Sequence, residues 1–233
     1  MSLLQNSVMY KYIVIIPARG GSKRFPGKNI YPLNGKPLLS YSIEYVKKIA
    51  GNMDIYVSTD SQAIGSVAIE YGAKIIQRPA ELSGDYVTTA ETLQHCAKEL
   101  LESNVEFDYL ILLQPTNPLR PDELLRKSME IMNSGNYDSL ITISPSYAKL
   151  GKMENGCFVP WNYKYGQRSQ DMEALYYENG LLYITKKELI LDGKITGEKM
   201  YPMIIEHIYG TIDIDTIEDL QYAEFVLNRE SKL

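Results

Sequence analysis

The sequence predicts an α/β protein with a doubly wound, mainly parallel sheet. Short apolar runs of strand length alternate with longer segments of helical period. The central runs are apolar throughout rather than at every second position, which is typical of strands buried on both faces. Such strands need helices above and below them, as in an open parallel sheet. The length of 233 residues is enough for one full core and too short for two large ones.

The predicted elements follow in order along the chain. The first strand is a fully apolar run that ends at Pro17. The second helix is capped by Ser61, and the helix that begins at Pro121 has proline in its first turn. The predicted strands span residues 10–17, 54–58, 73–77, 108–114, 139–144, 180–185, 201–207 and 211–215. The predicted helices span residues 37–50, 61–71, 88–102, 121–133 and 216–228.

The alternation of strands and helices breaks off between residues 145 and 178. This stretch is rich in turns and aromatic residues, Trp161 among them, and it shows no clean period. A structureless loop of this length is uncommon in a compact domain, so we expect a small excursion of strands. Aromatic residues are enriched at interfaces, which favours a partner subunit as the surface that it packs on. The predicted organisation is a tail or tag remnant at 1–8 and one domain at 9–233 with an inserted flap at about 145–178.

Composition excludes several classes of function. The net charge of −5 argues against a general nucleic-acid or anionic-membrane binder, because both need a basic surface. No apolar run approaches the roughly 20 residues of a membrane span. Two cysteines and two histidines, widely scattered, are too few for a disulfide framework or a Cys/His zinc site. We therefore expect a cytoplasmic protein with reduced thiols and with neither nucleic acid nor membrane as a partner.

The charge is unevenly distributed along the chain. The first carboxylate is Glu44, and six basic residues precede it. Four of these cations lie within ten positions of the loop at 17–29, which reads PARGGSKRFPGKN and follows the first buried strand. Ligands bind at the carboxyl ends of the strands in open α/β sheets, so this loop is the place to look for an anion site.

The loop matches neither of the two standard phosphate-binding motifs. The dinucleotide fingerprint G-x-G-x-x-G is absent. A Walker A motif is excluded because five residues separate Gly21 from Gly27 and because Asn29, not Ser or Thr, follows Lys28. Adjacent glycines and clustered cations nevertheless suit a polyphosphate. A solvated basic loop is the alternative, and the position after the first strand favours the anion site.

This loop resembles the N-terminal signature of the acylneuraminate cytidylyltransferases, which activate sialic and related nonulosonic acids as CMP-sugars. The likeness continues in order over nearly the whole chain, through residues 58–60 (STD), 78–82 (RPAEL), 113–120 (LQPTNPLR), 179–180 (NG) and 213–215 (DID). The related 3-deoxy-manno-octulosonate cytidylyltransferases usually have Pro-Leu after the Gly-Lys pair, where this sequence has Asn29 and Ile30.

The resemblance implies a fold, a reaction and partners. The fold is a nucleotidyltransferase-like, Rossmann-type sheet, and the inserted flap joins two subunits in a homodimer. The reaction is transfer of CMP from CTP to the anomeric hydroxyl of an acidic nine-carbon sugar, with release of pyrophosphate and with Mg²⁺ as cofactor. The implied setting is surface polysaccharide biosynthesis in the cytoplasm.

The resemblance also implies roles for individual residues. The nucleotide would be bound by Arg19, Gly21, Ser22, Lys23, Lys28, Asn29, Arg78, Asp85, Thr88 and Thr89. The sugar would be bound by Gln114, Arg168, Tyr177 and Asn179. Asp213 and Asp215 would hold Mg²⁺ and, with Lys23, form the catalytic set. The i, i+2 spacing of the two aspartates in a predicted strand directs both carboxylates to one face, and oxygen ligands suit Mg²⁺.

Several of these residues have a purely structural alternative. Thr88 and Glu91 match a capping box, and Asp215 or Thr216 could cap the last helix. Around Arg168 the order of residues departs from the usual pattern of the acylneuraminate enzymes, which leaves its contact with the sugar carboxylate open. The alternatives for the function are the same transfer to 3-deoxy-manno-octulosonate and a non-catalytic nucleotide-sugar-binding protein of the same fold.

Overall fold

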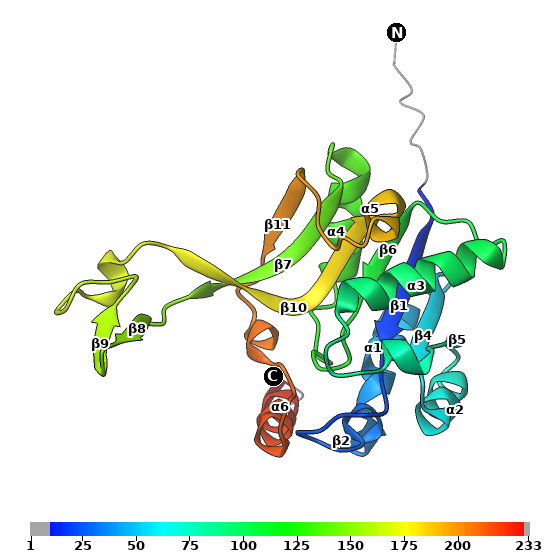
Figure 1. Cartoon of the computed structure of the whole chain (residues 1–233), viewed down its shortest axis with the longest axis horizontal. Coiled ribbons are helices and arrows are strands. Elements are labelled where there is room, and N and C mark those ends of the chain that lie inside the picture. The colour runs from blue at the N-terminus through cyan, green and yellow to red at the C-terminus, as the bar shows by residue number, and fades with distance from the viewer. Residues whose placement is uncertain (1–9, 231–233) are drawn as a thin grey trace, which may run out of the picture.

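The computed structural model describes residues 10–230, so the expected tail at 1–8 lies outside the described part of the chain. A seven-stranded sheet forms its centre (Figure 1). Its strands are β1 (Tyr12–Pro17), β4 (Asp54–Thr59), β5 (Lys74–Gln77), β6 (Tyr109–Leu112), β7 (Ser139–Ser146), β10 (Leu175–Lys186) and β11 (Met200–Ile204). They lie in the order β11-β7-β10-β6-β1-β4-β5. Only β10 is antiparallel, to both β6 and β7, which confirms the predicted mainly parallel sheet.

Helices cover both faces of the sheet. They are α1 (Leu38–Ile49), α2 (Gln62–Glu70), α3 (Thr89–Glu102), α4 (Leu124–Ser134), α5 (Lys187–Leu191) and α6 (Ile217–Glu230). Val14 and Ile16 of β1 pack with α1, α2 and α4, whereas Ile13 and Ile15 pack with α3 and α5. All four side chains are fully buried, which explains why this strand is apolar at every position.

A third apolar cluster lies outside the two faces of the sheet and determines the position of α6. The hairpin of β2 (Pro32–Leu33) and β3 (Lys36–Pro37) contributes Leu33, and α6 contributes Leu220 and Val226. Ile212 and Ile214 insert between them. No helix of the described chain is both long and apolar enough to cross a membrane.

The predicted strand at 211–215 is wrong. Residues Ile208–Thr211 form the 3-10 helix η4, and the residues that follow pair with no strand. Ile212 and Ile214 are buried in the third cluster, and the Ile214 N–H donates to the Thr116 carbonyl at 2.8 Å. The alternation of apolar and polar residues therefore reflects burial beneath α6 and not a place in the sheet.

Other boundaries differ by a few residues. The helix predicted from Pro121 begins at Leu124, and α5 and the β2–β3 hairpin were not predicted. The predicted N-cap of α2 is confirmed, since the Ser61 hydroxyl accepts from the Ile64 N–H.

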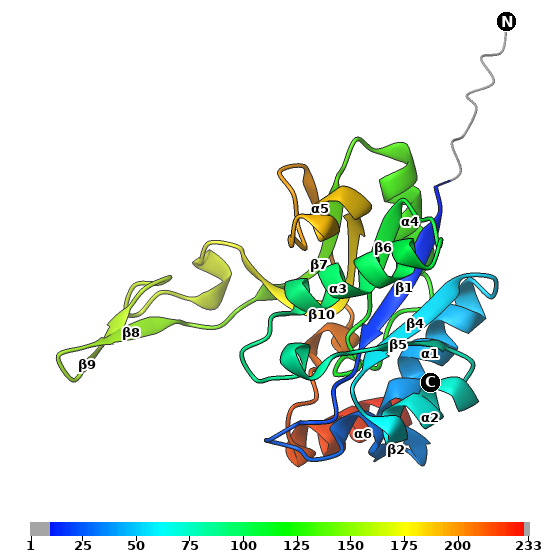
Figure 2. The same cartoon turned by 45° about the vertical axis from the view of Figure 1, so that its right-hand side comes forward.

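The chain between residues 147 and 174 forms an arm that projects away from the sheet (Figures 1 and 2). The ends of β7 and β10 pair with each other and carry it. It contains the two-stranded hairpin of β8 (Gly151–Glu154) and β9 (Cys157–Pro160) and the 3-10 helix η3 (Ser169–Asp171). Large apolar side chains of the arm are exposed, including Tyr147, Met153, Trp161 and Tyr165.

An irregularity in β10 brings three segments together. The register of β10 against β7 shifts between Glu178 and Tyr183, and Gly180 within the shift has a φ of +72°. A Cβ atom at Gly180 would lie 2.6 Å from Oδ1 of the buried Asn117. The Asn117 amide donates to the carbonyls of Asn179, at 3.0 Å, and Ile212, at 2.8 Å. Asn117 thereby joins the turn after β6 to β10 and to the segment before α6.

We expect Asn117→Ala to lower the free energy of unfolding by about 1–3 kcal/mol, because two buried carbonyls lose their donor. Urea denaturation followed by circular dichroism measures the change. Asn52→Ala, at an exposed turn, is the matched control and should cost less than about 0.5 kcal/mol. Equal losses in the two variants would contradict the joining role of Asn117.

Candidate nucleotide-binding site

A cavity of about 460 Å³ opens at the carboxyl ends of β1, β5 and β6. Its lining comes from four places: the loop after β1, Arg78 after β5, the segment that leads into α3, and the turn after β6. Asp215, just before α6, closes the wall. The cavity brings together ten of the residues expected from the sequence: Arg19, Ser22, Lys23, Lys28, Asn29, Arg78, Asp85, Thr89, Gln114 and Asp215.

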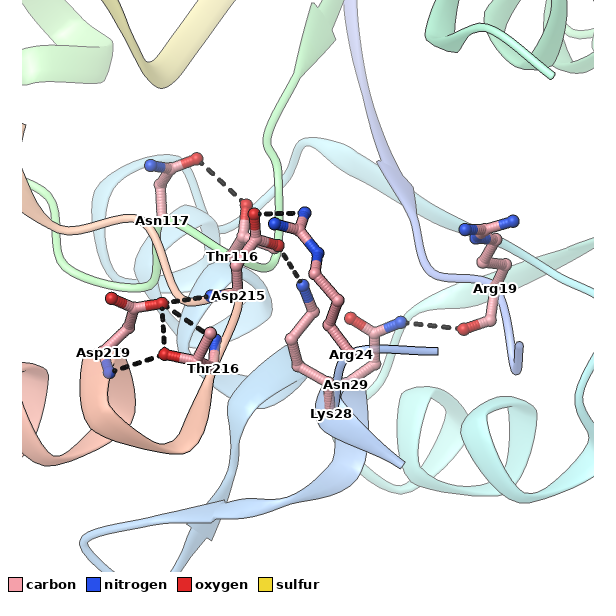
Figure 3. Close-up of polar contacts among 9 residues, drawn as sticks. All are labelled: Arg19, Arg24, Lys28, Asn29, Thr116, Asn117, Asp215, Thr216 and Asp219. Carbon is pink, nitrogen blue, oxygen red and sulfur yellow. Dashed lines mark hydrogen bonds and ion pairs between the residues drawn. The ribbon is translucent and has the colours of Figure 1, made fainter. Parts of the chain in front are cut away.

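The loop after β1 is held by hydrogen bonds at both ends. The Gly20 N–H donates to Oδ1 of Asp60 at 2.8 Å. The Asn29 amide donates to the Arg19 carbonyl at 2.9 Å (Figure 3). Gly27, with a φ of +70°, lets the chain turn into the 3-10 helix η1 (Lys28–Ile30). The loop thus has a defined shape that aims its cations at the cavity.

Two carboxylates pair with the four cations of this loop. Asp85 forms ion pairs with Arg19, at 3.1 Å, and with Lys23, and the Lys23 ammonium holds the pKa of Asp85 below its ordinary value. Asp215 pairs with Arg24 at 2.6 Å and with Lys28 at 2.8 Å (Figure 3). The pairs of the exposed Lys23 and Arg24 contribute little to stability, whereas Lys28 is buried beside Asp215. Four positive charges against two negative ones leave a net charge of +2, which suits an anionic ligand able to displace the carboxylates.

Arg78 is a fixed, buried cation in the same cavity. Only 5% of the residue is exposed. Its Nε donates to the Ser58 hydroxyl at 3.2 Å and its Nη2 donates to the Ser58 carbonyl at 2.9 Å. Burial lowers its pKa, and no carboxylate in residues 10–230 forms an ion pair with it. A rigid guanidinium without a counterion is well suited to donate to the acceptors of a bound ligand.

A second cavity, of about 320 Å³, adjoins the first. The two share Thr89 and Gln114. The rest of the second cavity is lined by Leu112, Glu178, Tyr183, Ile195 and Thr196. Gln114 therefore stands at the boundary between two compartments, which gives room for two ligands side by side.

Arg120, at the end of the segment 113–120, has a structural role beneath the site. It is buried, and burial lowers its pKa to about 10, so that it stays charged at neutral pH. It donates to the carbonyls of Gln114, at 2.9 Å, and Leu181, at 2.6 Å, and to the Ser42 hydroxyl at 2.9 Å. Arg120 thus fixes the backbone at Gln114 through a hydrogen bond to its carbonyl.

Asp213 and Asp215 lie side by side but in different surroundings. Asp213 is exposed at the surface, but partial desolvation by its neighbours raises its pKa, a hydrogen bond with Thr116 lowers it, and the charge of Asp215 raises it further. The capping of α6 falls to Thr216 and Asp219, because the Asp219 carboxylate accepts from the N–H groups of Asp215, at 3.0 Å, and Thr216, at 2.8 Å (Figure 3). Both aspartate side chains are therefore left free of a capping role.

Other expected site residues have structural partners or lie elsewhere. Thr88 is the N-cap of α3 in a complete capping box with Glu91, as its alternative predicted. The Asn179 amide is buried and donates to the Ser144 hydroxyl at 2.9 Å, and the Tyr177 hydroxyl donates to the Gly210 carbonyl at 3.1 Å. Arg168 lies in the arm, paired with Asp171 at 2.7 Å. The lining of the two cavities includes none of Gly21, Thr88, Arg168, Tyr177, Asn179 and Asp213.

The structure also shows lining residues that the sequence interpretation did not assign. Arg24 belonged to the run of four cations, so its charge was the available signal. Thr92 follows Thr89 by three positions and lies on the same face of α3. Glu178 and Tyr183 reach the second cavity through the irregularity in β10, for which no short motif gives a signal.

The fold and the site define a class: an α/β protein with a cationic cavity, suited to a polyphosphate, at the carboxyl edge of its sheet and beside a second cavity. Comparison with known proteins gives the particular family. The chain belongs to the cytidylyltransferase family, whose model matches residues 13–233.

Three curated relatives are named for diacetyllegionaminic, pseudaminic and N-acylneuraminic acids. The CMP-N,N'-diacetyllegionaminic acid synthase of Legionella pneumophila is 34% identical over 95% of this chain and 99% of its own length. The pseudaminic acid cytidylyltransferase of Campylobacter jejuni is 33% identical over 95% of this chain and 99% of its own. The N-acylneuraminate cytidylyltransferase of Streptococcus agalactiae is 34% identical over 90% of this chain, which spans 51% of that protein.

Solved structures of lower identity share the fold. A CMP:2-keto-3-deoxy-manno-octonic acid synthetase complexed with CTP superimposes with a TM-score of 0.70 at 16% identity, over 94% of this chain and 99% of its own. A 4-diphosphocytidyl-2C-methyl-D-erythritol synthase gives 0.67 at 17% identity, over 95% and 100%. Both confirm the nucleotidyltransferase-like fold.

The raised pKa of Asp213 gives a prediction about stability. Because the pKa is higher in the folded state, the ionised carboxylate opposes folding, but only weakly, since Asp213 is exposed and solvent screens its charge. The cost is absent below the ordinary aspartate pKa of about 3.9 and complete above the raised one. We expect Asp213→Asn to raise the Tm at pH 7, and the gain to shrink as the pH falls toward about 4. Thermal unfolding at both pH values measures it.

Asp192→Asn, at an exposed position, serves as the control and should leave Tm nearly unchanged at both pH values. A lower Tm for Asp213→Asn at pH 7 would mean that the carboxylate stabilises the fold, contrary to this interpretation.

Proposed function

We propose that this chain transfers CMP from CTP to the anomeric hydroxyl of a sialic-acid-like nonulosonic acid and releases pyrophosphate. The observation that carries the proposal is the cationic loop around a cavity that adjoins a second compartment at Gln114. One compartment suits the nucleotide and the other suits the sugar. The names of the curated relatives, all nonulosonic acid enzymes at 33–34% identity, support this choice of substrates.

The first cavity supplies charge neutralisation for the triphosphate. Arg19 and Lys23 exchange the Asp85 carboxylate for phosphate oxygens, and Lys28 does so with Asp215. Arg78, held by Ser58, donates to the carbonyl and ring-nitrogen acceptors of cytosine. Charge that develops on the leaving pyrophosphate is then stabilised by groups already in place.

Asp213 and Asp215 fit the requirements of a Mg²⁺ ion. Desolvation raises the pKa of Asp213 and the neighbouring charge of Asp215 raises it further, and a bound divalent cation would favour the ionised form of both carboxylates. Residues 10–230 hold no group of three His, Cys, Asp or Glu side chains placed to hold a metal. Two carboxylates suit Mg²⁺, which keeps waters and shares nucleotide phosphates. When bound, the ion would polarise the phosphoryl group and neutralise charge.

The second cavity suits the sugar because Gln114 links it to the nucleotide. A sugar in this compartment places its anomeric hydroxyl near the α-phosphorus, and positioning of this kind accounts for a large part of the rate of such reactions. The sugar carboxylate needs a cation, and the lining of the second cavity includes no Lys or Arg. The Arg168 side chain in the arm is 69% exposed, and the carboxylate of a sugar in a neighbouring subunit would replace Asp171 as its partner.

We further propose a homodimer joined through the arm. The exposed apolar side chains of the arm form a surface whose contact with water is unfavourable. A second copy of the chain would cover this surface. The cytoplasm is the proposed location, since CTP is available there and since Cys96 and Cys157 are both free thiols.

The function is tested by measuring pyrophosphate release from CTP with sialic, legionaminic, pseudaminic and octulosonic acids, with and without Mg²⁺. We expect release with at least one nonulosonic acid and only with Mg²⁺. Lys23→Ala should lower kcat/KM for CTP about tenfold or more, because a charged phosphate contact is lost. Lys98→Ala, exposed on α3, is the control and should match the wild type.

The other outcomes distinguish the alternatives. Release with octulosonic acid alone would mean that the substrate is 3-deoxy-manno-octulosonate and not a nonulosonic acid. Binding of CTP without release for any sugar would support a non-catalytic nucleotide-sugar-binding protein.

The dimer is tested with Trp161→Asp in the arm. A charge in the centre of the proposed interface should convert the dimer to a monomer at micromolar concentration, as measured by analytical ultracentrifugation. Ile69→Asp, on an equally exposed position of α2, should remain dimeric. A monomeric wild type, or a dimer that Trp161→Asp leaves intact, would contradict the arm interface.

A further inference from the structure

The charge of the second cavity is unexpected for a site that binds the proposed acidic sugar. Of its seven lining residues only Glu178 is charged, and its charge is negative. The proposed sugar is itself an anion at neutral pH. A carboxylate that lines the pocket of an anionic ligand repels the ligand unless it has a compensating role in binding.

The backbone of β10 directs Glu178 to this place. The register shift between Glu178 and Tyr183 contains Gly180, whose positive φ and contact with Asn117 leave no room for a side chain. The shift puts Glu178 and Tyr183, five positions apart, on the wall of the same cavity. The Tyr183 hydroxyl donates to Oε2 of Glu178 at 3.1 Å. The carboxylate is therefore oriented by a side chain that is itself 93% buried, since Tyr183 is only 7% exposed.

The other carboxylate oxygen remains available to a ligand. Within residues 10–230 no donor besides Tyr183 bonds to the Glu178 carboxylate. An ionised carboxylate only accepts hydrogen bonds, so it binds an N–H or O–H group. Leu112 and Ile195 line the same cavity and offer apolar contact beside this acceptor. An acylamino group, with one N–H and a small apolar acyl end, matches that combination.

We propose that Glu178, oriented by Tyr183, is a specificity-determining residue that accepts a hydrogen bond from an acylamino N–H of the sugar. This inference rests on the proposed function. The negative charge of Glu178 also determines how the sugar is oriented, because like-charge repulsion keeps the sugar carboxylate out of this compartment. The carboxylate end then points toward the cationic loop and the mouth of the site, and the neutral, acylated side enters the cavity. The relatives named for diacetyllegionaminic and N-acylneuraminic acids have substrates of this class.

The test compares the best nonulosonic substrate of the wild-type protein with analogues in which hydrogen replaces each acylamino group in turn. Glu178→Gln keeps the size of the side chain and removes its charge. We expect this variant to raise KM for the parent sugar about tenfold, since a charge-assisted hydrogen bond is weakened. KM for CTP should stay within about twofold of the wild type. With one analogue the variant and the wild type should become equal.

Two further variants separate this role from a structural one. Tyr183→Phe should raise KM for the parent sugar less than Glu178→Gln does, because the carboxylate remains but loses its orientation. Glu102→Gln, exposed at the end of α3, should behave as the wild type. Thermal unfolding of each variant verifies the fold, and Glu178 is an exposed residue whose isosteric replacement should leave Tm unchanged.

Two outcomes would overturn the inference and are distinct from a failure of the proposed function. Equal effects of Glu178→Gln on the parent and on every analogue would show that the carboxylate does not recognise an acylamino group. A raised KM for CTP in place of the sugar would assign Glu178 to the nucleotide. Absence of turnover by the wild type with any sugar would overturn the proposed function itself, and this inference with it.

Discussion

A buried arginine without a carboxylate partner supports the floor of the site. Arg120 donates hydrogen bonds to the carbonyls of Gln114 and Leu181 and to the Ser42 hydroxyl. One guanidinium therefore joins the turn after β6, the strand β10 and the helix α1. A buried cation is costly unless its donors are satisfied, and these three acceptors satisfy donors on all three guanidinium nitrogens of Arg120. The boundary between the two cavities therefore depends on this one group, although Arg120 lines neither of them.

The electrostatics of the first cavity follow from two carboxylates that each pair with two cations. Asp85 and Asp215 each join two cations of the loop after β1, which holds four flexible side chains near the positions needed for a polyphosphate. Because the pairs made by Arg19, Lys23 and Arg24 are open to solvent, exchanging their carboxylates for a ligand costs little, whereas Lys28 is buried and holds Asp215 more firmly. Asp215 has two possible partners, the cations and a metal ion, and transfer from one to the other would couple binding of the nucleotide to binding of the metal.

Local chemistry predicted more of this molecule than long-range packing did. The apolar run of β1, the cationic loop after it and the capping box at Thr88 are all determined by neighbours in sequence, and the structure has each of them. The segment at 211–215 misled the interpretation because alternate burial beneath α6 produces the same pattern as a strand. Glu178 was missed because a register shift in β10, determined by contact with Asn117 across the fold, directs it into the second cavity.

The strand β10, the one antiparallel member of the seven-stranded sheet, links the core of the fold to the arm. β10 pairs with β6 and β7 within the sheet, and its first residues leave the sheet paired with β7 alone. A two-stranded hairpin such as β8–β9 is marginally stable by itself in water, and the hydrogen bond from the Trp161 N–H to the Leu150 carbonyl gives the arm order without burying its aromatic side chains. The same strand lines the second cavity at Glu178 and Tyr183. Packing of the arm on another subunit would therefore act on β10 next to the proposed sugar compartment, so assembly and substrate binding would share one structural element.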